Sequence, residues 1–282
     1  MSSTAEQISS KEPRRSSRSG SRASFWSSTS IFAWREARTL ARNRFLHVFA
    51  IVAVAGGLLT THSAPSAAAI PFILLQLILY LIPLFSILIG LSSAHGELEE
   101  QMFLFSQPVP RLAVVIGKAT ALLISLALLL FVAFISSFIY APDKGTILML
   151  WAMAVLLGGV FIALGLAIGF STRDRARGVI AALLFWLVAL IGFDLIAYLT
   201  SMAPLMQQQP LLWIGILLIN PIDAIRVAVL LRLEDIPFSM ATEAPLVDLW
   251  LRWIVPWVFA IGLFWIALFL FWSHWQVERR EA

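Results

Sequence analysis

Six long runs of apolar residues, separated by shorter polar stretches, organise this chain. They cover residues 45–61, 70–93, 113–140, 147–170, 178–199 and 255–272 and are 17 to 28 residues long. About 20 helical residues, each rising 1.5 Å, cross the hydrocarbon core of a bilayer. The pattern therefore predicts an all-α integral membrane protein with six transmembrane helices.

The chain before the first run has two parts. Residues 1–30 hold 12 Ser, five basic residues and few large apolar ones, which predicts a disordered basic cytoplasmic tail. In residues 31–44, Trp34, Ala37 and Ala41 recur at helical spacing with arginines around the other face. This pattern predicts an N-terminal amphipathic helix at the membrane interface, and a plain basic flank to the first span is the alternative. Residues 45–282 would form the membrane domain.

The connection between the last two runs contains a second, shorter apolar stretch. Residues 211–219 are too few to cross a bilayer, so we expect two short helices on or dipping into the membrane, within an extracytoplasmic region at about 205–235. Asn220 can cap the second helix, Pro221 suits its first position, and Asp223 meets free backbone N–H groups. Arg226 is within pairing reach of Asp223. Helix initiation explains all four residues, and a gating role is an additional hypothesis.

Composition and charge agree with a membrane protein. The chain is 60% apolar and 13% charged, whereas about a quarter of the residues of a soluble domain are charged. Nine of its 20 Lys and Arg residues precede Phe45. If each of the six runs crosses the membrane, sixteen of the 20 lie on the same side as the N-terminus and four lie on the opposite side. The positive-inside rule then places both termini in the cytoplasm.

Chemistry for catalysis is missing from the sequence. The absence of cysteine excludes disulfides, thiolate metal sites and cysteine catalysis within this chain. No two of the four His residues share a helix face, and no Ser/His pair or carboxylate pair occurs within the predicted spans. We therefore expect a non-catalytic protein with no metal site and no nucleic-acid partner.

Apart from Lys118, which stands five residues after the start of the third run and is counted above with the cytoplasmic side, Asp194 is the one formally charged residue inside the six predicted spans. A charge at the bilayer centre costs about 2.5 to 3.5 kcal/mol, and less near an edge. Asp194 is therefore a candidate for a cargo path or gate. The alternative is that it reaches the outer surface or bonds to a neighbouring helix.

Two further features concern helix packing. Gly165-x3-Gly169 in the fourth span offers a small face that another helix could approach closely. Trp250, Trp253 and Trp257 before and at the start of the last span, with two more Trp at its end, fit interfacial aromatic belts. Burial within the protein is the alternative for each Trp.

The connection after the second span carries acidic residues followed by apolar ones. Three Glu precede two Phe and a Pro, which suits a short amphipathic helix with acids in its first turn: Glu97, Glu99, Glu100, Phe103, Phe105 and Pro108. Exposed Phe residues favour a docking element for a cytoplasmic protein over a solvated loop.

Glu97, Pro108, Arg111 and Gly117-Lys118 occur in an order and spacing that resemble those of the permease subunit of ABC-2 type transporters. The six runs and the basic amphipathic helix fit the same family. Phe193-Asp194-Leu195 and Asn220-Pro221-x-Asp223-x-x-Arg226 resemble, more narrowly, permeases linked to the maturation of multicopper enzymes, including nitrous oxide reductase.

The resemblance implies a homodimeric permease in the cytoplasmic membrane of a prokaryote, paired with a cytoplasmic ABC ATPase dimer that holds ATP and Mg²⁺. The residues from Glu97 to Arg111 would couple the two proteins. Asp194 and the Asn220 to Arg226 motif would form a gate, this chain would need no cofactor, and a periplasmic accessory protein could join the complex. The alternative from another class is a self-sufficient channel or ion-coupled carrier, which usually needs several intramembrane ionisable groups.

Overall fold

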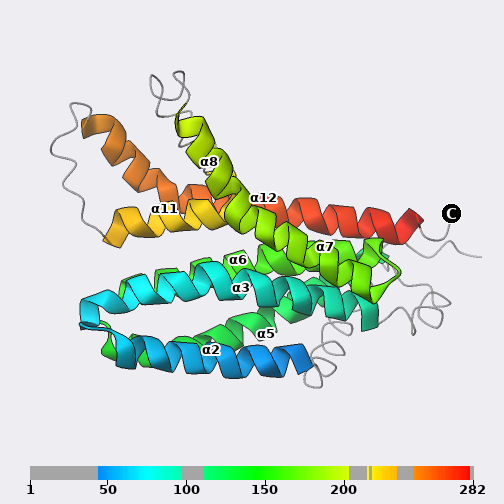
Figure 1. The fold of residues 1–282 in the computed structure, drawn as a ribbon, viewed down its shortest axis with the longest axis horizontal. Coiled ribbons are helices and arrows are strands. Elements are labelled where there is room, and N and C mark those ends of the chain that lie inside the picture. The colour runs from blue at the N-terminus through cyan, green and yellow to red at the C-terminus, as the bar shows by residue number, and fades with distance from the viewer. Residues whose placement is uncertain (1–43, 97–110, 203–214, 216–217, 234–243, 280–282) are drawn as a thin grey trace, which may run out of the picture.

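The computed structural model describes residues 44–96, 111–202, 215, 218–233 and 244–279 (Figure 1). The elements in chain order are α2 (Arg44–Ser63), the 3-10 turn η1 (Ala67–Ala69), α3 (Ile70–Gly96), α5 (Arg111–Tyr140), α6 (Lys144–Ser171), α7 (Arg175–Leu187), the π turn η2 (Val188–Gly192), α8 (Phe193–Ser201), α11 (Pro221–Leu233) and α12 (Ala244–Arg279). The described residues contain helices and no strand, in agreement with the predicted all-α fold. The predicted tail at 1–30, the interfacial helix at 31–44 except Arg44, the segment 97–110 and most of 203–217 lie outside the described residues.

Six helical stretches of the described chain are long and apolar enough to cross a membrane. They are Phe45–Ser63, Ala67–Gly96, Leu112–Tyr140, Lys144–Ser171, Arg175–Thr200 and Trp253–Arg279. Each contains one of the six predicted runs, so the prediction of six spans is confirmed. The last helix, however, begins at Ala244 and continues through Pro256, which makes the connection before it shorter than the hydropathy pattern indicates.

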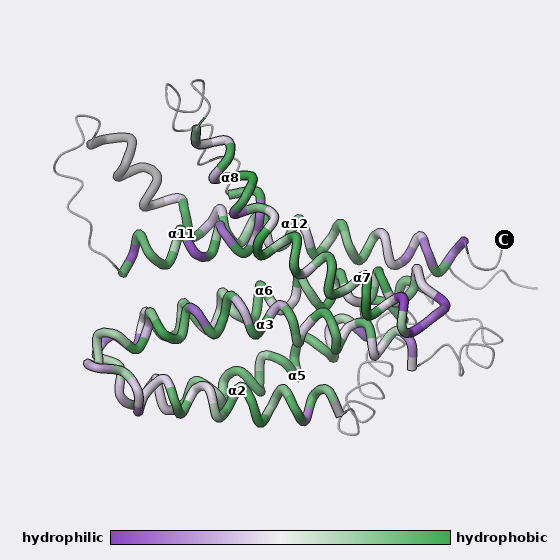
Figure 2. The backbone as a smooth tube through the Cα atoms, viewed as in Figure 1, coloured by the Kyte–Doolittle hydropathy of each residue, from purple (hydrophilic) through white to green (hydrophobic). Residues whose placement is uncertain are grey.

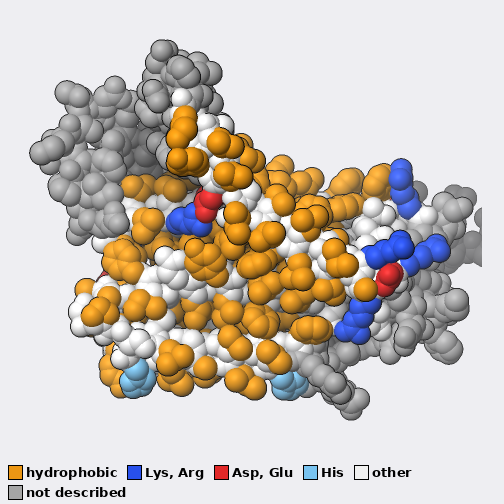
Figure 3. Space-filling view, in the orientation of Figure 1, with side chains coloured by type: hydrophobic (Ala, Val, Ile, Leu, Met, Phe, Trp, Pro, Cys, Tyr) orange, Lys and Arg blue, Asp and Glu red, His pale blue; other side chains and the backbone are white. Residues whose placement is uncertain are grey.

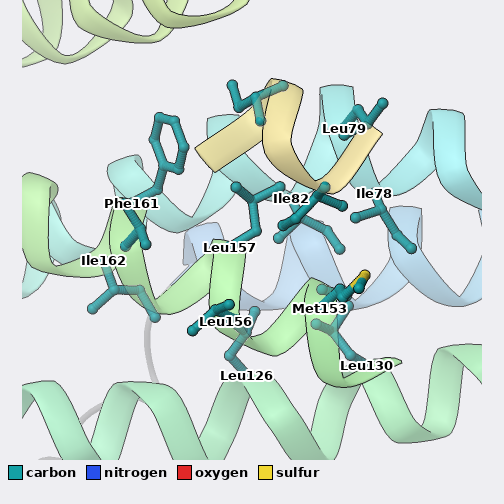
Figure 4. Close-up of a cluster of buried hydrophobic side chains, with 14 of the residues drawn as sticks. Ile78, Leu79, Ile82, Leu126, Leu130, Met153, Leu156, Leu157, Phe161 and Ile162 are labelled. Carbon is teal, nitrogen blue, oxygen red and sulfur yellow. The ribbon is translucent and has the colours of Figure 1, made fainter. Parts of the chain in front are cut away.

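Helix α6 is the centre of the bundle. Most of its residues are buried, on all sides of the helix, because α3, α5 and α12 surround it. A helix that is apolar all round is expected in this position. In the core, Ile82 of α3 and Leu126 of α5 meet Met153 and Leu157 of α6 (Figure 4).

Glycines bring the backbones of α3 and α6 into direct contact. A Cβ atom added at Gly165 would overlap the carbonyl oxygen of Ile87, and one added at Gly90 would overlap the carbonyl oxygen of Ile162. Gly169 lies in the same seam, against Ala94. The small face predicted at Gly165-x3-Gly169 is therefore confirmed as a site of close helix approach.

Several exposed Arg residues of the described chain gather at one end of the bundle. Figure 2 shows hydrophilic residues at the turn between α6 and α7, where Arg173, Arg175 and Arg177 are exposed. The C-terminal end of α12 lies at the same end, and its Arg279 sits 3.6 Å from the centre of the Trp275 ring. We call this the basic end of the bundle.

Asp143 fixes the start of α6 at the opposite end. Its Oδ1 accepts a hydrogen bond from the backbone N–H of Gly145 at 2.9 Å, and the Thr146 hydroxyl donates to its Oδ2. These bonds, the one from the Thr146 hydroxyl first, hold the pKa of Asp143 below its ordinary value. The carboxylate therefore stays ionised and satisfies helix N–H groups that lack partners.

Candidate translocation site

Asp194, Asp223 and Arg226 form one ionic cluster between α8 and α11. Arg226 Nη1 donates a 2.7 Å hydrogen bond to Asp194 Oδ1 and lies 3.0 Å from Asp223 Oδ1. The second contact is an ion pair without the direction of a hydrogen bond. Figure 3 shows the adjoining basic and acidic side chains on an otherwise apolar face where α8 meets α11. Of the two readings of Asp194, bonding to a neighbouring helix is thus observed, and a gating role stays a prediction.

The three charged side chains differ in exposure. The Asp223 side chain is 2% exposed, that of Arg226 24% and that of Asp194 48%. With two carboxylates and one guanidinium, the cluster has a formal charge of −1. Asp223 therefore depends on Arg226 for its compensation, whereas Asp194 still reaches the surroundings.

Asn220 starts α11 and also ties it to the fifth span. Its Oδ1 accepts a 3.3 Å hydrogen bond from the N–H of Ile222, and its backbone carbonyl accepts from the N–H of Ala224 at 2.9 Å. Pro221 is the first helical residue, as the sequence predicts. The side-chain Nδ2 of Asn220 donates to Asp223 Oδ2 at 2.6 Å and to the backbone oxygen of Ala189 at 2.8 Å. The second bond could not be foreseen from the helix-capping pattern.

The fifth span is interrupted at the point that Asn220 contacts. Between α7 and α8, residues Val188–Gly192 form a π turn, and the N–H of Phe193 bonds to the oxygen of Val188, five residues earlier. The single apolar run at 178–199 gives no sign of this interruption. A π turn inserts one extra residue into a helix and often marks a functional site. Beyond it, α8 bends away from the bundle (Figure 1).

Two Trp side chains of α12 bind the irregular turn before α11. Trp265 Nε1 donates to the oxygen of Ile219 at 3.0 Å, and Trp257 Nε1 makes a longer 3.4 Å contact with the oxygen of Leu218. Non-helical backbone at membrane depth is tolerated only where protein groups satisfy it. Trp257, which was expected at an interface, thus has a protein partner, and Trp265 is a site residue that sequence reasoning missed.

Changing Trp265 to Phe removes this donor while keeping an aromatic ring. We expect a loss of about 1 kcal/mol in the free energy of unfolding, because the oxygen of Ile219 loses its hydrogen bond. Thermal unfolding of the detergent-solubilised protein measures the change. Trp253, whose side chain is 63% exposed, supplies the control: Trp253→Phe should have a smaller effect. Equal effects would contradict the role assigned to Trp265.

A cavity of about 240 Å³ adjoins this cluster. Its walls come from the middle of α6, the π-turn region of the fifth span, the start of α11 and α12: Val160, Phe161, Leu164, Phe185, Val188, Ala189, Phe193, Asn220, Pro221, Trp265 and Phe269. Asn220 is the one amide among these apolar and aromatic residues. The cavity therefore shares Asn220 and Ala189 with the hydrogen bond that ties α11 to the π turn.

The described residues offer no metal site. Within them, no group of three His, Cys, Asp or Glu side chains is placed to hold a metal ion. The ionic cluster contributes two carboxylates, but Arg226 lies between them.

The predicted coupling residues fall mostly beyond the described structure. Glu97, Glu99, Glu100, Phe103, Phe105 and Pro108 lie outside the described residues, and Arg111 is the first residue of α5. The helices that flank the segment are joined to each other: Lys118 Nζ of α5 donates to both the backbone oxygen and the hydroxyl of Ser93 of α3, at 3.1 Å each. His95 Nε2 also lies 3.4 Å from the Thr172 hydroxyl at the α6–α7 turn.

Six candidate spans, of which α6 is the buried central one, define a multi-pass membrane protein, and comparison with known families identifies its kind. Residues 30–282 match the family model described as ABC-2 family transporter protein. Because this match covers nearly the whole chain, the chain belongs to the ABC-2 family. It is a non-catalytic transmembrane subunit of a transporter. A search of curated proteins gives no match.

Proposed function

We propose that this chain is the permease of an ATP-driven exporter and that it works as a homodimer with a separate cytoplasmic ATPase dimer. ABC-2 permeases pair with ABC ATPases generally, and ATP and Mg²⁺ would be held by that partner. The observation that supports the proposal is the position of the two helix ends that flank the Glu- and Phe-bearing sequence. Helix α3 ends at Gly96 and α5 begins at Arg111, both at the basic end of the bundle (Figure 1).

The helices on either side of this segment would receive the motion of the ATPase. Since Lys118 ties α5 to Ser93 of α3, a force on the segment between them acts on both helices together. Helix α3 in turn contacts α6 along the glycine seam. ATP binding drives transport only if its free energy differs between the two states of the permease.

The ionic cluster would be the moving contact. Asp194, on the fifth span, is half exposed, so breaking its pair with Arg226 costs less than exposing a fully buried charge. Arg226 would then keep Asp223 compensated within α11, whose start is fixed by Asn220 and Pro221. In this proposal α8 and α11 separate and rejoin as the transporter changes state.

A narrower role in the maturation of a multicopper enzyme is also proposed. It is supported by the resemblance of Phe193-Asp194-Leu195 and of the Asn220 to Arg226 motif to permeases of that group. The cargo would be a species needed by that enzyme.

Changing Phe103 and Phe105 together to Ser should strongly weaken docking of the ATPase. Two apolar anchors are lost, so we expect at least about a tenfold drop in the ATPase that co-purifies with the permease, equivalent to about 1.4 kcal/mol. The matched control is Phe103→Leu with Phe105→Leu, which keeps apolar side chains and should retain most of the ATPase. Full recovery with the Ser variant would show that this segment is not the docking element.

The orientation can be tested with single cysteines, because the chain has none of its own. Lys144 and Arg175 are exposed and stand at opposite ends of α6 and its following turn. In intact cells, a membrane-impermeant maleimide should label Lys144→Cys, whereas Arg175→Cys should react only after lysis. Labelling of both from outside would contradict cytoplasmic termini and the span count.

A further inference from the structure

The cavity beside η2 has walls that suit an apolar ligand. None of its eleven lining residues is charged, and five are Phe or Trp. The amide nitrogen of Asn220 already donates to Asp223 and to the oxygen of Ala189. An ion or a strongly polar group entering the cavity would lose water without gaining partners, whereas an apolar group would lose nothing.

The cavity lies at the depth of hydrocarbon. Its α6 wall extends from Val160 to Leu164, which are eleven and seven residues before the end of α6 at Ser171. At 1.5 Å per residue this is about 10 to 17 Å from the basic end of the helix. A bilayer core is about 30 Å thick, so lipid head groups do not reach this depth, but their acyl chains do.

The cavity is partly open, and the rim formed by two of its exposed lining residues belongs to a membrane span. Phe185 and Val188 line it and are 46% and 48% exposed. Neighbouring residues of the same span, including Leu184 and Ile191, are also exposed and apolar. The rim therefore faces the region that acyl chains fill. A cavity of about 150 Å³ can hold benzene, so 240 Å³ is enough for a segment of chain.

We infer that this cavity is a lipid-binding site that takes one acyl chain of a bilayer phospholipid. The bound chain contacts Ala189 and Asn220, whose hydrogen bond joins the fifth span to α11. Lipid occupancy thus acts at the contact between the π turn and α11. The site does not depend on the identity of the cargo or on the presence of an ATPase.

Photochemical cross-linking tests the site in the full-length chain. The protein is reconstituted in phosphatidylcholine vesicles that contain a phosphatidylcholine with a diazirine at the middle of one acyl chain, and the adducts are mapped by mass spectrometry. We expect adducts on the inner wall, at Phe161, Leu164 or Trp265. Ala189→Phe fills the cavity and should reduce these adducts at least fivefold. Ile191→Phe adds the same ring in the same π turn outside the cavity lining and should leave them unchanged.

Adducts on exposed surfaces provide the internal reference. Ile51 and Leu59 of α2 are 70% and 62% exposed, and their labelling should be equal in all variants. If Ala189→Phe does not yield monodisperse protein, Leu164→Phe fills the cavity from the opposite wall. Inner-wall labelling that persists in a filled variant overturns the inference. The absence of lipid adducts on the inner wall also overturns the inference. In that case a Val188→Cys variant that forms a disulfide with a second copy would show that the partner permease covers the opening. Loss of ATPase docking would leave these lipid results unchanged, so the two proposals fail separately.

Discussion

Replacing Arg226 with Met is expected to lower the free energy of unfolding by about 3 kcal/mol, because the substitution leaves the buried Asp223 carboxylate without its counter-charge. Asp223 is 2% exposed and cannot turn to water as Asp194 can. Unfolding of the solubilised protein, followed through its 11 Trp residues, measures the loss. The double variant Arg226→Met with Asp223→Asn should recover part of it, since no buried charge then remains.

Asp194→Asn is the comparison within the same cluster. Its side chain is about half exposed, so we expect a loss of less than about 1 kcal/mol and a normal protein level. Transport in cells should nevertheless fall if the pair is a gate. Normal transport in this variant would show that Asp194 has no gating role and that its contact with Arg226 is structural. A larger loss of stability from Asp194→Asn than from Arg226→Met would contradict the argument that the buried Asp223 depends on Arg226 more than the half-exposed Asp194 does.

Changing Gly90 to Ala should destabilise the α3–α6 pair by about 2 kcal/mol. The new Cβ would overlap the carbonyl oxygen of Ile162, and a backbone atom cannot move aside as a flexible side chain can. The helices must therefore separate, and this cost exceeds the gain of up to about 1 kcal/mol that Ala brings over Gly in a helix. The midpoint of thermal unfolding in detergent should fall accordingly.

The same substitution at the end of the same helix provides the control. A Cβ atom at Gly96 would have no neighbour within 4 Å, so Gly96→Ala should leave the unfolding midpoint unchanged or raise it. If both variants behaved alike, the backbone contact between Gly90 and Ile162 would not be a determinant of stability. Gly165→Ala, which meets Ile87 from the other side of the seam, should reproduce the effect of Gly90→Ala.

Much of the fold could be predicted because its determinants are local. The length and hydropathy of each run gave all six spans, since crossing a bilayer demands about 20 apolar residues whatever surrounds them. Asn220 and Pro221 marked the start of α11 because helix capping depends on neighbouring residues alone. The pairing of Asp223 with Arg226, three residues apart, could be foreseen for the same reason.

The rest of the candidate site depends on contacts between distant parts of the chain. The partner of Asp194 is 32 residues away, and the apolar pattern of the fifth span reads the same whether that span is a regular α-helix or contains a π turn. The sequence gives no sign that Trp265 differs from other aromatic residues of the spans, because its hydrogen-bond acceptor, the oxygen of Ile219, is 46 residues earlier in the chain.

The sequence by itself therefore determined the membrane class, the number of spans and the start of α11, because partition into lipid and helix capping are set within short windows of residues. Only the tertiary structure decided which helix faces meet. It showed that α3 contacts α6 through glycines, that Asn220 bonds to the π turn, and that Arg226 lies between two carboxylates. The physical reason is that these contacts depend on the rotation and separation of whole helices, which the packing of all neighbouring side chains fixes together.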